Sequence, residues 1–401
     1  MKKWISIWIL LIATSALGQT HNFWTKKNDF GGLKRERAVA FVVDSLAFVG
    51  TGVDTAENVL NDFWKYNVEN DAWEQVADLP GSVRRNAVAF TINGKGYVGT
   101  GMDSVAASSA GSQTLSDFWS YDPTLNSWTQ KMDFPGSNGT GIYFSTAFSI
   151  DSKGYICGGK RGPNDYTDEL WEYKPSVDQC AQLQDFPGGV RYQLSSFSIG
   201  YQGYVGLGTD QDYYRNDIWM FDATTNQWTQ KADFPASERA SSMTFNIGQR
   251  GYICMGANGG LLDDLWEYNP EYDQWSLKAS YGGSARKNAV AFTVNNKAYV
   301  GTGKGYSGKK ASMYEYTPSD FLSIQEENSI QLNLYPNPAS EVLHIDSEIK
   351  MKNIQIINSS GRMILNTTKK NIPINHLKNG VYHVKIELEN SIIKTEKFLK
   401  I

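Results

Sequence analysis

The chain has 401 residues, with 38 basic and 42 acidic side chains, a net charge of −4 and no long block of like charge. Proteins that hold nucleic acid gather lysine and arginine against the phosphates, so this charge balance argues against nucleic acid as a partner. The three cysteines are too few and too scattered for a disulfide framework.

Residues 1–18 have the pattern of a secretory signal peptide. Lys2 and Lys3 precede an apolar run from Trp4 to Leu17, and small residues stand just before Gln19. This run is too short to span a bilayer comfortably, and no other run approaches the length of a transmembrane helix. We therefore expect export into the periplasm, a mature chain that begins near Gln19 and no stable membrane span.

Between residues 24 and 316 one pattern recurs six times. Its leading aromatic residue recurs at intervals of 47 to 55 residues, with cysteine in one place: Trp24, Trp73, Trp128, Cys180, Trp228 and Trp275. A unit of this length is too long for the helix pairs of common solenoids. It suits one four-stranded blade of a β-propeller, which cannot bury both of its faces alone.

The second repeat illustrates the expected blade. A small, apolar innermost strand is followed by an Asn-Gly turn, a strand that ends in glycines, a strand with alternating aromatics and an outer tryptophan strand. These segments are Ala87–Thr91, Asn93–Gly96, Tyr97–Gly101, Asp117–Tyr121 and Trp128–Lys131. Each blade thus takes three strands from one repeat and its fourth strand from the next.

The two ends of the repeat region complement each other. No tryptophan strand follows Tyr316 in the last repeat, whereas the strand at Trp24–Lys27 has no blade before it. We therefore expect the N-terminal strand to complete the sixth blade and to close the ring, which removes exposed strand edges.

Over residues 24 to 318 the sequence resembles the kelch family of β-propellers, of the type found in the central domain of galactose oxidase. The residues that carry the resemblance are the leading tryptophans, the second-strand tyrosines and the third-strand tryptophans: Tyr97, Tyr155, Tyr204, Tyr252 and Tyr299, with Trp64, Trp119, Trp171, Trp219 and Trp266. Kelch repeats usually carry a Gly-Gly pair, which only Gly158-Gly159 provides here. The resemblance implies an all-β fold with a six-bladed propeller over residues 19–318.

A different module follows a polar connector at residues 319–330. Residues 331–401 contain short β-type runs separated by turns, which predict a small immunoglobulin-like β-sandwich. This module is similar to the C-terminal sorting domain of type IX secretion cargo, the Por secretion tail of Bacteroidetes. The matching residues are Tyr335, Pro336, Asn337, Pro338, Gly361, Gly380, Tyr382 and Lys397. The resemblance implies the type IX machinery as a partner and a final place in the medium or on the outer cell surface; the alternative is an ordinary appended binding domain.

The histidines limit the chemistry of the propeller. His21, His344, His376 and His383 all lie outside the repeats, so the propeller has no imidazole for a general base or a metal. The copper oxidases with kelch-type blades need two histidine ligands, which argues against that activity. We expect no metal and no cofactor, although Asp210 and Asp212 leave calcium open as a minor hypothesis.

An arginine stands eleven residues after five of the six leading positions: Arg35, Arg84, Arg191, Arg239 and Arg286. Each precedes an innermost strand, at the end where the connections between second and third strands also lie. One interpretation is structural, with the arginines bonded to acidic side chains of a neighbouring blade, such as Asp62, Asp117, Asp217 and Asp264. The other is a ligand-binding face for an anion or glycan, with Tyr166, Tyr192, Tyr213 and Tyr214 as stacking surfaces.

The sequence therefore favours an exported, monomeric binding module for a glycan or protein ligand over an enzyme. The alternative is a carbohydrate-active enzyme that resembles the bacterial kelch-type N-acetylneuraminate (sialic acid) epimerases. That alternative rests on resemblance of the fold, and a fold does not determine a function. The sequence assigns no catalytic residue.

Overall fold

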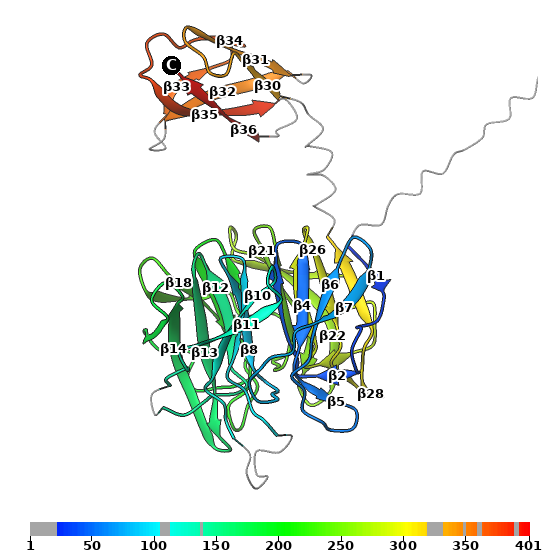
Figure 1. Cartoon of the computed structure of the whole chain (residues 1–401). Helices are drawn as coiled ribbons and strands as arrows, with labels where there is room; N and C mark the ends of the chain where they lie inside the picture. Colours follow the sequence, from blue (N-terminus) through cyan, green and yellow to red (C-terminus); the bar gives the residue numbers. More distant parts are fainter. Residues whose placement is uncertain are drawn as a thin grey trace, which may run out of the picture. The chain divides into compact units, whose positions relative to one another are not determined.

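The computed structural model describes residues 22–104, 113–136, 139–318, 332–347, 350–358, 363–388 and 393–401 (Figure 1). The expected signal peptide and the whole connector at residues 319–330 lie outside these ranges. The chain forms two compact units, Met1–Pro318 and Ser319–Ile401. Among the residues described, no helix is long and apolar enough to cross a membrane.

In the described part of the first unit, six antiparallel sheets have four strands each. The first three, from the innermost strand outward, are β3 (Val39–Val43), β4 (Leu46–Gly50), β6 (Phe63–Asn67) and β7 (Ala72–Val76); β8 (Val88–Ile92), β9 (Lys95–Gly99), β10 (Phe118–Asp122) and β11 (Ser127–Lys131); β12 (Thr146–Ile150), β13 (Lys153–Gly162), β14 (Asp165–Lys174) and β15 (Gln179–Gln182). The other three are β16 (Ser195–Ile199), β17 (Gln202–Gly206), β18 (Ile218–Asp222) and β19 (Gln227–Lys231); β20 (Met243–Ile247), β21 (Arg250–Ala257), β22 (Leu261–Asn269) and β23 (Gln274–Lys278); β25 (Val290–Val294), β26 (Lys297–Gly301), β29 (Met313–Thr317) and β1 (Phe23–Lys27).

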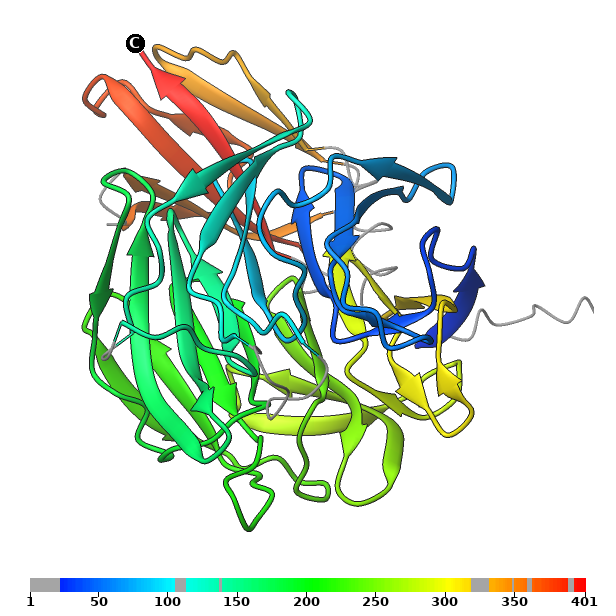
Figure 2. The same ribbon diagram turned by 60° about the horizontal axis from the view of Figure 1, so that its bottom comes forward.

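These sheets are the blades of a propeller. The innermost strands β3, β8, β12, β16, β20 and β25 lie next to one another in this order, and β25 lies next to β3, so the ring is closed (Figure 2). Small residues at the second position of these strands allow the close approach, as at Ala40 and Ala89. The phenylalanine that follows stacks on an aromatic ring of the second strand, as Phe148 does on Tyr155 with ring centroids 5.2 Å apart.

The N-terminal strand completes the last blade, as the sequence predicted. β1 pairs antiparallel with β29, and Trp24 is opposite Tyr316. The Trp24 indole donates to the Ala279 carbonyl at 3.0 Å and packs against the rings of Tyr281 and Tyr316 at 5.0 and 5.1 Å. The two ends of the repeat region are thus joined in one sheet.

Short strands mark one end of the propeller, the lower end in Figure 1. β2 (Arg35–Glu36) pairs with β5 (Val53–Asp54), and β27 (Lys304–Gly305) pairs with β24 (Arg286–Lys287) and with β28 (Gly308–Lys309). In each case a segment that precedes an innermost strand meets a connection between second and third strands. The prediction that both lie at the same end is therefore confirmed.

The second unit contains two antiparallel sheets around one apolar core. One sheet has the order β30 (Leu332–Tyr335), β31 (Val342–Ser347), β34 (Asn371–Pro373); the other has the order β33 (Met363–Thr367), β32 (Met351–Asn358), β35 (Gly380–Leu388), β36 (Ile393–Lys400). Leu343 from the first sheet and Ile354, Val384 and Phe398 from the second belong to the same buried cluster. The immunoglobulin-like order of the strands stays a prediction.

Candidate functional site at the mouth of the propeller channel

The arginines of the repeat are buried ion-pair partners. The Arg35 side chain has no exposed surface, and its Nη1 and Nη2 donate to the two carboxylate oxygens of Asp62 at 2.6 and 2.7 Å. It also donates to the Thr51 carbonyl and stacks over Phe30. Asp62 accepts a further hydrogen bond from the Trp64 indole at 2.8 Å. Burial by itself would raise the pKa of Asp62, but the bonds and charge of Arg35 hold that pKa below its usual value.

The same arrangement recurs in the second, fourth and fifth blades, in the trios Arg84–Asp117–Trp119, Arg191–Asp217–Trp219 and Arg239–Asp264–Trp266. The partner aspartate belongs to the same blade as its arginine, not to a neighbouring blade as expected. In the third blade Arg161 takes this role and donates to Glu169 at 2.9 Å, while the Trp171 indole donates to the same carboxylate. In the sixth blade Arg286 meets Ser312 in place of an aspartate.

The prediction that these five arginines form a ligand-binding face is therefore corrected. Their side chains are between 0 and 3% exposed, and each guanidinium faces its own blade. Arg191 in particular stacks on Phe186 and binds Asp217, and does not face the loop of Tyr213 and Tyr214. The structural interpretation holds, because an arginine with its donors turned into the fold presents none of them to a ligand.

The residue two positions after each repeat arginine, or its counterpart in the third blade, forms a ring around the channel mouth. We call this ring the collar; its members are Arg37, Asn86, Phe144, Gln193, Ser241 and Asn288. All six have positive φ, between 53° and 62°. Each backbone N–H donates to the carbonyl of the member in the preceding blade, and Arg37 donates to Asn288, so the circle of hydrogen bonds is complete. The backbone is thereby fixed, while the side chain differs in nearly every blade.

A cavity of about 150 Å³ lies within the collar, and its lining includes Arg37, Asn86, Phe144, Gln193, Ser241 and Asn288. Asn86 is 8% exposed, and among the described residues no group accepts a hydrogen bond from its Nδ2. Asn288 differs, because its Nδ2 donates to the Glu36 carboxylate at 2.8 Å. The collar thus combines a fixed backbone with a buried donor for which the described part of the chain supplies no acceptor.

Beside the collar, three tyrosines surround a lysine. We call Tyr143, Tyr166, Tyr192 and Lys160 the tyrosine cluster. The Lys160 ammonium lies 4.9 Å from the ring centroid of Tyr166 and 4.7 Å from that of Tyr192, and these two rings stack at 5.3 Å. No described carboxylate forms a salt bridge with Lys160, and burial lowers the pKa of this lysine. The cluster therefore offers aromatic faces and a cation without a carboxylate partner.

The remaining expected site residues lie on the loop between β17 and β18. Tyr213 is 64% exposed, and the Arg215 guanidinium lies 5.8 Å from its ring. Tyr214 is half-buried and bridges to Thr209, which in turn bridges to Tyr192. Asp210 accepts hydrogen bonds from the backbone of Asp212 and Tyr213 and from Arg215. Both of its oxygens are thus engaged, and no cluster of three or more metal-binding side chains occurs among the described residues, so calcium gains no support.

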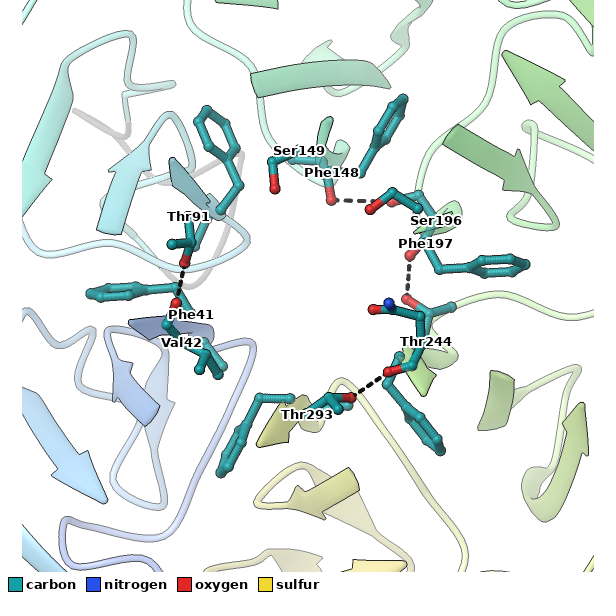
Figure 3. Close-up of a pocket in the computed structure, with 18 residues that line it drawn as sticks. Phe41, Val42, Thr91, Phe148, Ser149, Ser196, Phe197, Thr244 and Thr293 are labelled. Carbon is teal, nitrogen blue, oxygen red and sulfur yellow. Dashed lines mark hydrogen bonds between the residues drawn. The ribbon is translucent and has the colours of Figure 1, made fainter. Parts of the chain in front are cut away.

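The interior of the channel is polar but small. A second cavity, of about 260 Å³, lies between the innermost strands, and Figure 3 shows the phenylalanine rings pointing away from its centre. The hydroxyls of the lining threonines and of Ser196 donate to backbone carbonyls of the preceding blade, as Thr91 does to Val42 at 2.6 Å and Thr293 to Asn246 at 2.8 Å. These hydroxyl protons are used in joining blades, which leaves the collar as the better candidate site.

In the second unit, the sorting-motif residues join the two ends of the module. The Asn337 side chain donates to the Lys397 carbonyl and accepts from the Leu399 backbone, both at 3.0 Å. Tyr335, next to Pro336, is exposed and stacks on His344, whereas Tyr382 is buried against Phe398. Pro338 leads into Ala339, which bridges to Lys400, and Gly380 opens β35. Gly361 lies outside the described residues.

A closed ring of four-stranded blades, whose second strands carry a tyrosine (Phe48 in the first blade) followed by glycine, defines the first unit as a kelch-type β-propeller. The model of the KLHDC2/KLHL20/DRC7 Kelch-repeats domain matches residues 143–303, and that of the Secretion system C-terminal sorting domain matches residues 333–400. The chain thus contains a kelch-repeat domain and a type IX sorting domain, as the sequence resemblance implied. The sorting domain indicates export to the cell surface or into the medium.

A solved structure of YjhT is similar in fold. It superimposes with a TM-score of 0.59 at 16% sequence identity, over 73% of this chain and 95% of that chain. At this identity the likeness shows the fold alone. No curated protein matches the chain.

The collar residues are not part of the repeated pattern of the sequence, so the repeats did not indicate them. Arg35 and its equivalents recur because most blades repeat the same buried contact with an acidic side chain. Arg37, Asn86 and Phe144, in contrast, occupy one structural position with unlike side chains. The signal that could have located the site was this variation two residues after an arginine that recurs in five of the six repeats. Tyr166 and Tyr192, which the sequence did indicate, lie in the tyrosine cluster.

Proposed function

We propose that the exported propeller binds a carbohydrate at the collar end, with the tyrosine cluster as its stacking surface. The observation that carries the proposal is the stacked, half-buried pair Tyr166 and Tyr192 beside Lys160 and the collar cavity. Aromatic faces next to polar donors suit sugars, which present C–H faces and hydroxyls together. The residues come from neighbouring blades, so the rigid ring fixes their spacing.

Replacing Tyr192 by alanine is expected to weaken glycan binding roughly tenfold, or about 1.4 kcal/mol. The loss follows because one of the two stacked rings is removed, while the backbone bridge of residue 192 to Thr209 is retained. A glycan array on the full chain would supply the ligand, and calorimetric titration would measure the change.

Tyr201→Ala is the matched control, because Tyr201 is 59% exposed on the turn after β16, at the opposite end of that strand from the collar. An equal loss of affinity in both variants, or no loss at position 192, would exclude the tyrosine cluster as the binding surface.

The export route is tested by removing residues 326–401. The two units have separate cores, so the propeller should fold without the second unit. We expect the truncated protein to accumulate in the periplasm in folded form, as measured by cell fractionation and protease resistance. Truncated protein at the cell surface in the normal amount would contradict a sorting role for the second unit.

Sugar turnover at the same place is the alternative function that the sequence left open. A binding module leaves anomer exchange of the bound sugar at its spontaneous rate, whereas an epimerase accelerates that exchange at catalytic protein concentrations. NMR exchange spectroscopy on sialic acid with the full chain distinguishes the two.

A further inference from the structure

Two buried donors at the collar have no hydrogen-bond acceptor among the described residues. Asn86 Nδ2 and Arg37 Nε are buried atoms for which the described residues supply no hydrogen-bond acceptor, and both side chains line the 150 Å³ cavity. A buried donor without an acceptor destabilises the folded chain, because it loses its hydrogen bonds to water without replacement. Arg37 belongs to the first blade and Asn86 to the second, which is its neighbour. A single ligand group with two acceptor atoms can therefore accept a hydrogen bond from each donor.

The charges around the cavity favour an anion. Arg37 and Arg85 lie in adjacent blades. The pKa of Arg85 is lowered to about 10, mainly because the side chain is buried and secondly because Arg37 is also positively charged. The carboxylates that act on Arg85 are Glu36 and Glu57. Glu36 Oε2 lies 3.6 Å from Arg37 Nε and already accepts a hydrogen bond from Asn288, and Glu57 forms a salt bridge with Lys309. Lys160 adds a third positive charge beside the collar. Arg37, Arg85 and Lys160 thus outnumber these two carboxylates among the described residues.

We propose that the collar is a subsite for the carboxylate of an acidic sugar, bound by Arg37 and Asn86, with the sugar ring directed toward the tyrosine cluster. The proposal rests on the carbohydrate function above and names the class of sugar. A carboxylate only accepts hydrogen bonds, and its two oxygens match two donors. The stacked rings of Tyr166 and Tyr192 beside the cavity favour a sugar over an acidic peptide.

The test compares D-glucuronate with D-glucuronamide, which has the same shape without the charge, in titrations of the full chain at constant ionic strength. We expect glucuronate to bind at least tenfold more tightly, and Asn86→Asp to remove this preference. The new carboxylate would repel the ligand, whereas glucuronamide affinity should change less than twofold. Aspartate tolerates the positive φ of 54° at this position, so the fold should be retained.

Asn126→Asp is the matched control. Asn126 also has positive φ, its side chain accepts from Tyr121 and the Ala77 backbone, and Asp71, Asp178 and Asp273 hold the equivalent place in other blades. The Asn126→Asp substitution adds the same negative charge at a position away from the collar, so it should leave glucuronate binding unaltered. Arg37→Gln provides a second collar variant with the same expected loss, should Asn86→Asp fail to fold.

Equal affinity for glucuronate and glucuronamide, or a preference that survives both collar variants, would overturn the subsite. Neutral glycans bound through Tyr192 without any preference for carboxylate would overturn it and leave the proposed carbohydrate function intact. Asn86-dependent binding of hexaglutamate, with no glycan bound at all, would overturn both and assign the collar to an acidic protein partner.

Discussion

Replacing Arg239 by methionine is expected to lower the free energy of unfolding by about 3 kcal/mol, because removal of one partner from a buried ion pair leaves the other without its counter-charge. Arg239 is 1% exposed, and it donates to both carboxylate oxygens of Asp264 and to the Met255 carbonyl. Methionine keeps much of the side-chain volume over Phe234, so the loss reports the charged contacts. Urea unfolding of the full chain, followed by tryptophan fluorescence, measures it.

Arg286→Met is the internal comparison. Arg286 is equally buried and stacks over Tyr281, but its side-chain partners are the hydroxyls of Ser284 and Ser312. Its removal leaves no carboxylate without a partner among the described residues, so we expect a clearly smaller loss. Equal losses at positions 239 and 286 would show that packing and carbonyl contacts, and not the ion pair, determine the stability of each blade.

Replacing Trp24 by alanine is expected to cost about 3 kcal/mol, at the lower end of the range for a large aromatic in a core, because this indole is only partly buried. The change removes two ring contacts and the hydrogen bond to the Ala279 carbonyl. Since β1 is held to β29 by main-chain pairing and this side chain, we also expect residues 22–27 to become sensitive to protease. Thermal unfolding and limited proteolysis measure the two effects.

Trp73→Ala is the control for closure of the ring. Trp73 occupies the equivalent outer strand of the first blade, which is continuous in sequence with its neighbours, and its indole N–H has no acceptor among the described residues. It should lose stability without exposing the N-terminus to protease. A Trp24→Ala protein that unfolds like its parent would mean that the ring does not depend on this strand.

The period of the repeat was sufficient to predict the fold. A repeat of 47 to 55 residues with three β-type runs, together with an unmatched strand at Trp24 and a missing strand after Tyr316, predicted both the blade and the closure that the pairing of β1 with β29 confirms. Closure could be predicted because an outer strand without a blade at one end and a blade without an outer strand at the other end remove each other's exposed edge when they pair. The sorting module could be recognised because its motif residues cluster at the C-terminus.

The candidate ligand site could not be predicted from the repeat in the same way. Spacing placed the five arginines at the correct end of the propeller, but it gave no information on where their side chains point. The buried contact of Arg35 with Asp62 of its own blade depends on how three strands pack, which no local pattern specifies. The collar residues escaped notice because they do not repeat.

The sequence alone thus determined the class of fold, the closing strand and the sorting module, because hydrophobic alternation, turn residues and repeat length act locally and identically in every blade. Only the tertiary structure decided which polar residues remain available to a ligand. A guanidinium is satisfied or free according to the acceptors that the folded chain brings near it. Arg35 binds Asp62 and is buried, whereas Asn86 is held by the collar backbone beside a cavity, and its Nδ2 has no acceptor among the described residues.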